Sequence, residues 1–222
     1  MAAGIFDIIG PVMVGPSSSH TAGAVRLGNI ARQISRDNII KADFYLHGSF
    51  ARTFQGHGTD RALLGGILGF RPDDERIKDV FKYAGEQNME YHFYTADLGE
   101  VHPNTVKIVL EDQRGKKLSI TGSSTGGGNI LITAIDDMPL EFTGRYPTII
   151  TRHQDKPGIV ARTAATLSGY EINIAFLKVF RPSRGSEACM VIETDQDINN
   201  SLINELENQA GINRVIFIKP LS

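Results

Sequence analysis

Residues 148–222 alternate between strand-like and helix-like patterns in an order that few folds accommodate. Short β-branched and aromatic runs predict four strands, and two stretches with apolar residues at spacings of three and four predict two helices. The expected strands are 148–152, 171–180, 188–194 and 214–219. The first expected helix begins at Pro157, and the second contains Leu202, Ile203 and Leu206. The order βαββαβ is that of the ferredoxin-like plan, so this part of the chain is predicted to be an α+β domain of its own.

The preceding residues predict a second, larger α+β domain with an antiparallel or mixed sheet. A boundary is expected near residues 142–147, which gives domains at 1–145 and 148–222. The patterns predict an extended piece at 8–14, helices at 21–36, 75–87 and directly after Asp60, and strands at 43–50, 91–94, 105–111, 117–121 and 130–135. Residues 112–115 are read as a hairpin loop.

Residues 15–23 (GPSSSHTAG) form a dense polar run just before a predicted helix. The first amides of a helix have no partners inside the helix, and the helix dipole is positive at that end. No Asp or Glu stands between Asp7 and Asp37 to neutralise the site. The run therefore predicts a site for a small anion such as a carboxylate, with His20 as a nearby base. The alternative is an ordinary N-cap after a turn, but one cap explains only one serine.

Two further polar stretches have the same character. Residues 56–60 (GHGTD) precede an apolar helix, and residues 122–129 (GSSTGGGN) separate two strands. His57 is either a loop histidine or part of a pocket shared with His20, because two helix starts can face one anion. The three glycines indicate either a flexible hairpin or backbone that approaches a ligand closely. A P-loop is excluded, since no Gly-Lys-Ser/Thr and no helix follow.

Composition limits the classes of partner and cofactor. The net charge of -2 gives no reason to expect nucleic acid or an anionic membrane. No apolar run is long enough to span a bilayer, and the first residues lack the basic segment of a signal peptide. The single cysteine, Cys189, excludes an internal disulfide and fits a cytoplasmic protein. One thiol also cannot hold an iron–sulfur cluster, and no metal ligands are assigned in this chain.

Residues 148–222 resemble an ACT domain, the small amino-acid-sensing module of enzymes of amino-acid metabolism. The resemblance rests on a strand, Asp-Lys-Pro-Gly, a helix and then Ile-Asn-Ile. It implies that an effector such as serine would contact His153, Asp155, Gly158 and Asn173. Many such modules only dimerise, so effector binding and dimerisation both stay open. Cys189 is expected to be an inert core thiol.

The motifs GPSSSHT at 15–21, GHGTD at 56–60 and STGGG at 124–128 resemble the beta chain of the iron–sulfur-dependent L-serine dehydratases (L-serine ammonia-lyases). With the ACT module, the resemblance covers essentially the whole chain. It implies a fold like the allosteric substrate-binding domain of phosphoglycerate dehydrogenase. It also implies a heteromer in which an alpha subunit holds the 4Fe–4S cluster.

The implied reaction converts L-serine to pyruvate and ammonia, in amino-acid catabolism and gluconeogenesis. One cluster iron would act as a Lewis acid on the substrate hydroxyl while a base removes the α-proton. His20 and His57 are the candidates for acid and base, with their individual roles open. The candidate substrate-binding residues are Ser17, Ser18, Ser19, Thr21, Thr59, Asp60, Ser124, Gly126, Gly127 and Gly128.

Two alternatives come from other classes of function. The chain would be a regulatory subunit if its first domain only senses serine while the alpha subunit performs all the chemistry. A small-metal hydrolase would use His20, His47 and His57, but no HxH or HExxH pair supports it.

Overall fold

A computed structural model describes residues 11–221 of the chain, as two compact units. The first unit ends at Asp137 and the second begins at Met138, earlier than the expected boundary near 145. The strand β6 (Met138–Phe142) accounts for the earlier boundary. It contacts β8 and β9 of the second unit, and its Glu141 forms an ion pair with Lys178. The first part of the extended piece expected at 8–14 lies outside the described residues.

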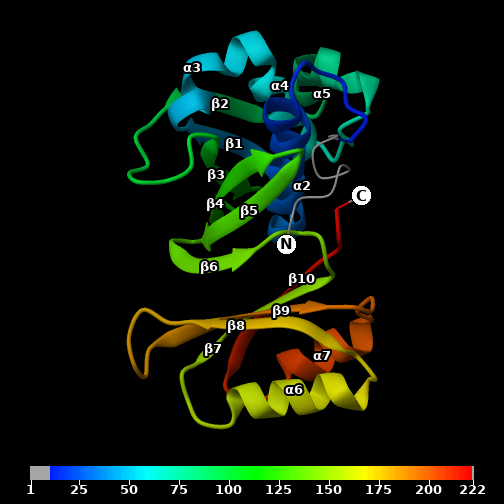
Figure 1. The fold of residues 1–222 in the computed structure, drawn as a ribbon, viewed down its shortest axis with the longest axis vertical. Helices are drawn as coiled ribbons and strands as arrows, with labels where there is room; N and C mark the ends of the chain where they lie inside the picture. The colour runs from blue at the N-terminus through cyan, green and yellow to red at the C-terminus, as the bar shows by residue number, and fades with distance from the viewer. Residues whose placement is uncertain (1–10, 222) are drawn as a thin grey trace. The chain divides into compact units, whose positions relative to one another are not determined.

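The first unit carries its helices against one face of a sheet (Figure 1). In chain order the helical segments are a π-helical turn η1 (Ser18–Gly23), α2 (Ala24–Ser35), α3 (Gly48–His57), α4 (Thr59–Ile67), the 3₁₀ turn η2 (Glu75–Asp79) and α5 (Val80–Glu86). Buried Leu27, Ile30 and Ile34 lie along one side of α2, as the sequence spacing predicts.

The sheet that these helices cover has both parallel and antiparallel strand pairs, in agreement with the predicted mixed sheet. Its strands are β1 (Ile39–Leu46), β2 (Glu90–Thr95), β3 (Thr105–Asp112), β4 (Lys117–Gly126), β5 (Asn129–Ile135) and β6. They follow the order β2-β1-β3-β4-β5-β6, in which β1 is parallel to β2 and antiparallel to β3. Alternate residues of β1, namely Ala42, Phe44 and Leu46, are fully buried, which is the pattern of a strand with one covered face.

Two glycines let α2 and α4 approach backbone to backbone. A Cβ on Gly28 would lie 2.4 Å from the Leu63 carbonyl oxygen, and one on Gly66 would lie 2.2 Å from the Val25 carbonyl oxygen. Neither position has room for a side chain. The close crossing holds the start of α4 near η1, which α4 also contacts.

The prediction of a strand at 43–50 is wrong at its end. The strand stops at Leu46, and α3 begins at Gly48. Gly48 has a positive φ of 55° and lies so close to Pro103 that an added Cβ would be 2.6 Å from its carbonyl oxygen. The amide of Ser49 donates to the same oxygen at 2.7 Å. The contact with Pro103, which is distant in sequence, fixes the start of α3. The local sequence pattern does not reveal this contact.

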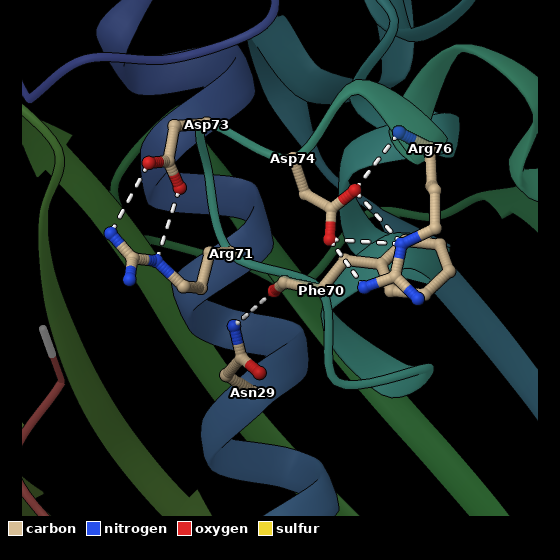
Figure 2. A network of polar contacts seen from close by, with 6 residues as sticks. All are labelled: Asn29, Phe70, Arg71, Asp73, Asp74 and Arg76. Atoms are coloured by element: carbon tan, nitrogen blue, oxygen red, sulfur yellow. Dashed lines mark hydrogen bonds and ion pairs between the residues drawn. The ribbon is translucent and has the colours of Figure 1, made fainter.

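A polar network fixes the segment between α4 and η2 (Figure 2). Asn29 on α2 donates its side-chain amide to the Phe70 carbonyl oxygen at 3.0 Å. The Arg76 guanidinium pairs with Asp74 and stacks 4.2 Å from the centroid of the Phe70 ring. The neighbouring Arg71–Asp73 pair stiffens the same turn. This arrangement sets the course of η2, which carries residues 77 and 78 to the cavity described below.

The second unit has the predicted βαββαβ order and a four-stranded antiparallel sheet. Its elements are β7 (Thr148–Gln154), α6 (Ile159–Gly169), β8 (Ile174–Phe180), β9 (Glu187–Thr194), α7 (Asn200–Glu207) and β10 (Ile212–Ile218). The strand order is β10-β7-β9-β8, and α6 and α7 lie on the same face (Figure 1). Ile149, Leu167, Met190 and Leu202 belong to the core between sheet and helices. This is the ferredoxin-like arrangement.

Candidate active site

The polar run predicted at 15–23 becomes the π-helical turn η1 at the head of α2. Ser17 caps this turn, and its hydroxyl accepts from the His20 amide at 3.4 Å. The backbone amide of Thr21 donates to the Ser17 carbonyl oxygen at 2.8 Å. His20 and Thr21 are consequently buried, whereas Ser18 and Ser19 are half-buried. Turns of this type are frequent at functional sites.

Two histidines from separate polar stretches lie against each other. The rings of His20 and His57 are 4.8 Å apart between centroids and nearly perpendicular. His57 is the last residue of α3, whereas the sequence placed it in a polar stretch before the next helix. Gly58, at a positive φ of 69°, turns the chain directly from α3 into α4. The two polar stretches thus meet at the contact between His20 and His57.

Serine hydroxyls contact both ring nitrogens of His20. Ser17 Oγ lies 3.4 Å from Nδ1, and Ser49 Oγ lies 3.3 Å from Nε2. Burial, and secondarily the neighbouring His57, lower the pKa of His20 below its usual value. A neutral imidazole at neutral pH can accept a proton. Ser49 was not predicted as a site residue. The sequence pattern placed it in a strand at 43–50, whereas the structure has it in α3.

A cavity of about 260 Å³ opens beside the two histidines. It is lined by residues 14–16, Thr21, residues 55–58, Arg61, Ile77 and Lys78. His57 is exposed and lines this space, whereas His20 is buried, contacts His57 and is not among the lining residues. This volume lies just below the range of about 300–1,000 Å³ that is common for small-molecule pockets, so the space can hold a small molecule such as an amino acid. Arg61 and Lys78 were not predicted, although Arg61 directly follows the GHGTD motif.

Three buried hydroxyls surround this region without a hydrogen-bond partner among the described residues. They belong to Thr21, Thr59 and Ser124. Thr21 lines the cavity, and Thr59 is the first residue of α4. Ser124 lies on β4 against η1, where a Cβ on Gly23 would be 2.0 Å from its hydroxyl oxygen. Buried hydroxyls usually have partners, so the set suits a polar ligand.

Other predicted substrate-binding residues do not line the described part of the cavity. Asp60 accepts from the backbone amide of Arg61 at 2.8 Å and forms no described bond with His57. Burial raises the pKa of Asp60, while the Arg61 amide and charge oppose the rise. Ser18 and Ser19 are absent from the lining as well.

The three glycines form the tight turn between β4 and β5. Gly126, Gly127 and Gly128 have positive φ values of 104°, 59° and 79°, and glycine adopts such a run of positive φ values at the lowest cost. The Gly128 carbonyl oxygen accepts from Arg26 Nη1 at 2.8 Å. The turn therefore accounts for the glycines without a ligand.

The predicted effector residues of the second unit do not converge within one chain. Asp155 accepts from Arg181 at 2.6 Å and from the Gly185 amide at 2.9 Å, and these contacts lower its pKa. Asn173 instead donates to Asp195. The pairing of β9 with β7 and β8 puts Asp155 and Asn173 at opposite ends of the sheet, roughly 20 Å apart at strand spacing.

The remaining two effector candidates are near Asp155. His153 is buried on β7, bonds to Thr151 Oγ1 at 3.1 Å and has its pKa lowered by burial. Gly158 precedes α6 at a positive φ of 90°. One chain alone therefore brings together His153, Asp155 and Gly158, but not Asn173.

The described residues hold no group of three or more His, Cys, Asp or Glu side chains that could bind a metal ion. His47, counted among the candidate ligands of a hydrolase, accepts from the Leu98 amide at 3.2 Å. Cys189 is buried on β9, and burial raises its pKa to about 12. Within residues 11–221, no helix has the length and apolar character to cross a membrane.

Comparison with known proteins identifies the family. The model of the serine dehydratase beta chain matches residues 4–96, and that of the ACT domain matches residues 148–211. An L-serine dehydratase beta chain from Peptoniphilus asaccharolyticus is 44% identical, with 89% of each chain covered. A probable L-serine dehydratase beta chain from Bacillus subtilis is 43% identical and covers 95% of this chain and 96% of the relative. The chain belongs to the L-serine dehydratase beta-chain family.

Segments similar to this chain also occur within longer proteins. A D-3-phosphoglycerate dehydrogenase of Methanocaldococcus jannaschii is 26% identical over 88% of this chain, but over only 37% of its own length. The resemblance stated from the sequence to both enzyme groups is confirmed. The serine dehydratase beta-chain model covers η1, α3 and the start of α4, the segments that bring His20 and His57 together.

Proposed function

We propose that this chain is the beta subunit of a two-chain L-serine dehydratase that converts L-serine to pyruvate and ammonia. The observation that carries the proposal is the contact between His20 and His57 beside a cavity of amino-acid size. The names of the two beta-chain relatives supply the substrate and the subunit role. A cytoplasmic location, inferred from the single cysteine, stays a prediction.

The two histidines have different surroundings, which suggests a division of labour. His57 faces the cavity, so we assign it the proton transfer with the substrate. His20 is buried in contact with His57, between two serine hydroxyls, and its lowered pKa keeps it uncharged beside His57. Loss of the α-proton and of the hydroxyl group gives 2-aminoacrylate, which tautomerises to an imine and is hydrolysed to pyruvate and ammonia.

The residues of this chain do not fit an iron–sulfur cluster. Such clusters are held by several thiolates, whereas the only thiol here is buried and has a raised pKa. The family resemblance implies a 4Fe–4S cluster, and we propose that an alpha partner chain holds it. This chain would supply substrate-binding groups and the acid or base.

The test uses a complex reconstituted from this chain and its alpha partner. We expect His57→Ala to lower kcat by about 100-fold or more while the KM for L-serine changes little. His92→Ala, on β2 and away from the cavity, is the matched control and should retain kcat. An unchanged kcat in both His57→Ala and His20→Ala would contradict the catalytic role.

A regulatory role is the second candidate, and one observation favours it. The similar segments in D-3-phosphoglycerate dehydrogenases belong to proteins whose names describe a different reaction. A shared function of that segment would be ligand binding rather than dehydration. In that case the histidine variants would change the serine concentration dependence and leave kcat intact.

A further inference from the structure

The cavity beside His57 has a cationic wall built from two elements. Arg61 comes from the first turn of α4, and Lys78 comes from η2 on the facing segment. None of the described residues that line the cavity carries a carboxylate. The charge of the lining therefore favours an anion.

Arg61 is better placed than Lys78 to receive a ligand. Lys78 forms an ion pair with Glu75. The Arg61 guanidinium forms no hydrogen bond or ion pair with the residues that the structure describes; its only ring contact is with Phe81, 5.9 Å from the ring centroid. Its neighbour Asp60 accepts from the Arg61 backbone amide, and the Arg61 charge acts on this carboxylate without an ion pair between the two side chains. The side chain is thus exposed and free to pair with an anion in the cavity.

A buried hydroxyl independently indicates a polar ligand in the same space. Thr21 lines the cavity with only 2% of its surface exposed, and its Oγ1 has no described partner. Thr59, fully buried at the first residue of α4, has no described side-chain partner either. The positive end of the nine-residue helix α4 adds to the attraction for an anion beside these hydroxyls.

We propose that Arg61 binds the α-carboxylate of the amino-acid substrate, with Thr21 as a hydroxyl donor to the same ligand. A guanidinium presents two parallel N–H groups that match the two oxygens of a carboxylate, which an ammonium cannot do. Pairing of the carboxylate with Arg61 puts the rest of a small amino acid within the same cavity as His57. This inference rests on the proposed function, because it takes an amino acid as the ligand.

The experiment compares Arg61→Gln and Arg61→Lys in the reconstituted complex. It measures the KM for L-serine and the inhibition constant of L-serinamide, in which an uncharged amide replaces the carboxylate. We expect Arg61→Gln to raise the KM about ten- to hundredfold and to leave kcat within about threefold, with partial recovery in Arg61→Lys. The inhibition constant of L-serinamide should stay nearly the same. Arg52→Gln, an exposed arginine on α3 outside the cavity lining, is the control.

Two results would overturn the inference. An unchanged KM in Arg61→Gln would exclude Arg61 from substrate binding. An equal rise in the KM for L-serine and in the inhibition constant of L-serinamide would indicate general damage to the cavity. The proposed function is judged separately by kcat of His57→Ala: a loss there with an unchanged KM in Arg61→Gln rejects only the arginine. A raised KM in Arg61→Gln with normal kcat in His57→Ala supports Arg61 and rejects the catalytic assignment.

Discussion

At the scale of single residues, the site is a buried imidazole in contact with an exposed one. The sequence predicted both histidines as candidates from their polar neighbours. It could not predict Ser49. The contact of Ser49 with His20 depends on the start of α3 at Gly48, which packs against Pro103. Arg61 was equally hidden, because a helix-start arginine is ordinary and only the cavity around it gives it a possible role.

The buried state of His20 predicts a pH-dependent stability. Its pKa is lowered in the folded chain, first by burial and then by His57, from about 6.5 in the unfolded chain. Below that value the unfolded chain binds a proton that the folded chain does not, so stability falls as the pH decreases. We expect His20→Gln to weaken the shift of the urea midpoint between pH 7.5 and 5.5. The pKa of His153 is also lowered by burial, so the contribution of His153 to the pH dependence of stability should remain in the variant. Identical shifts in wild type and variant would contradict this.

At the scale of elements, the best-predicted features are those with a local period. The amphipathic α2, the hairpin of β3 and β4, and the βαββαβ order of the second unit all follow from such patterns. A feature fixed by a distant contact was missed. The helix α3 depends on Pro103, which lies far away in sequence.

The crossing of α2 and α4 predicts an inverted effect of alanine. Alanine usually stabilises a helix relative to glycine, by about 0.5–1 kcal/mol. At Gly66 the added Cβ would lie 2.2 Å from the Val25 carbonyl oxygen, so the helices would have to separate. We expect Gly66→Ala to lower the free energy of unfolding by about 1–3 kcal/mol in urea denaturation.

Gly85→Ala is the matched control for that crossing. Gly85 also lies in a helix, α5, but an added Cβ would meet nothing within 4 Å. Its free energy of unfolding should stay equal or rise. Equal effects at Gly66 and Gly85 would show that the α2–α4 contact does not require glycine.

At the scale of the whole molecule, each unit has its own candidate site, and of the two only the site in the first unit is assembled from the described residues of one chain. The cavity in the first unit is assembled from a single chain, whereas Asp155 and Asn173 of the second unit lie at opposite ends of its sheet. We therefore expect calorimetric titration of the full chain with L-serine to detect one class of site. Arg61→Gln should weaken that binding about ten- to hundredfold, and Asp155→Ala should leave it unchanged.

A second class of serine site, lost in Asp155→Ala, would contradict this expectation. It would require an effector site in the ACT module, with Asn173 supplied by another copy of the chain. Absence of such a site would leave dimerisation as the module's proposed role.

The central claim is that His57 takes part in the removal of the α-proton of serine. The most direct measurement is the kinetic isotope effect on kcat with α-deuterated L-serine, in the reconstituted complex with His57→Gln. If His57 transfers this proton, its loss slows C–H cleavage, so kcat should fall and the isotope effect should rise above that of the wild type. An unchanged kcat with an unchanged isotope effect would contradict the claim.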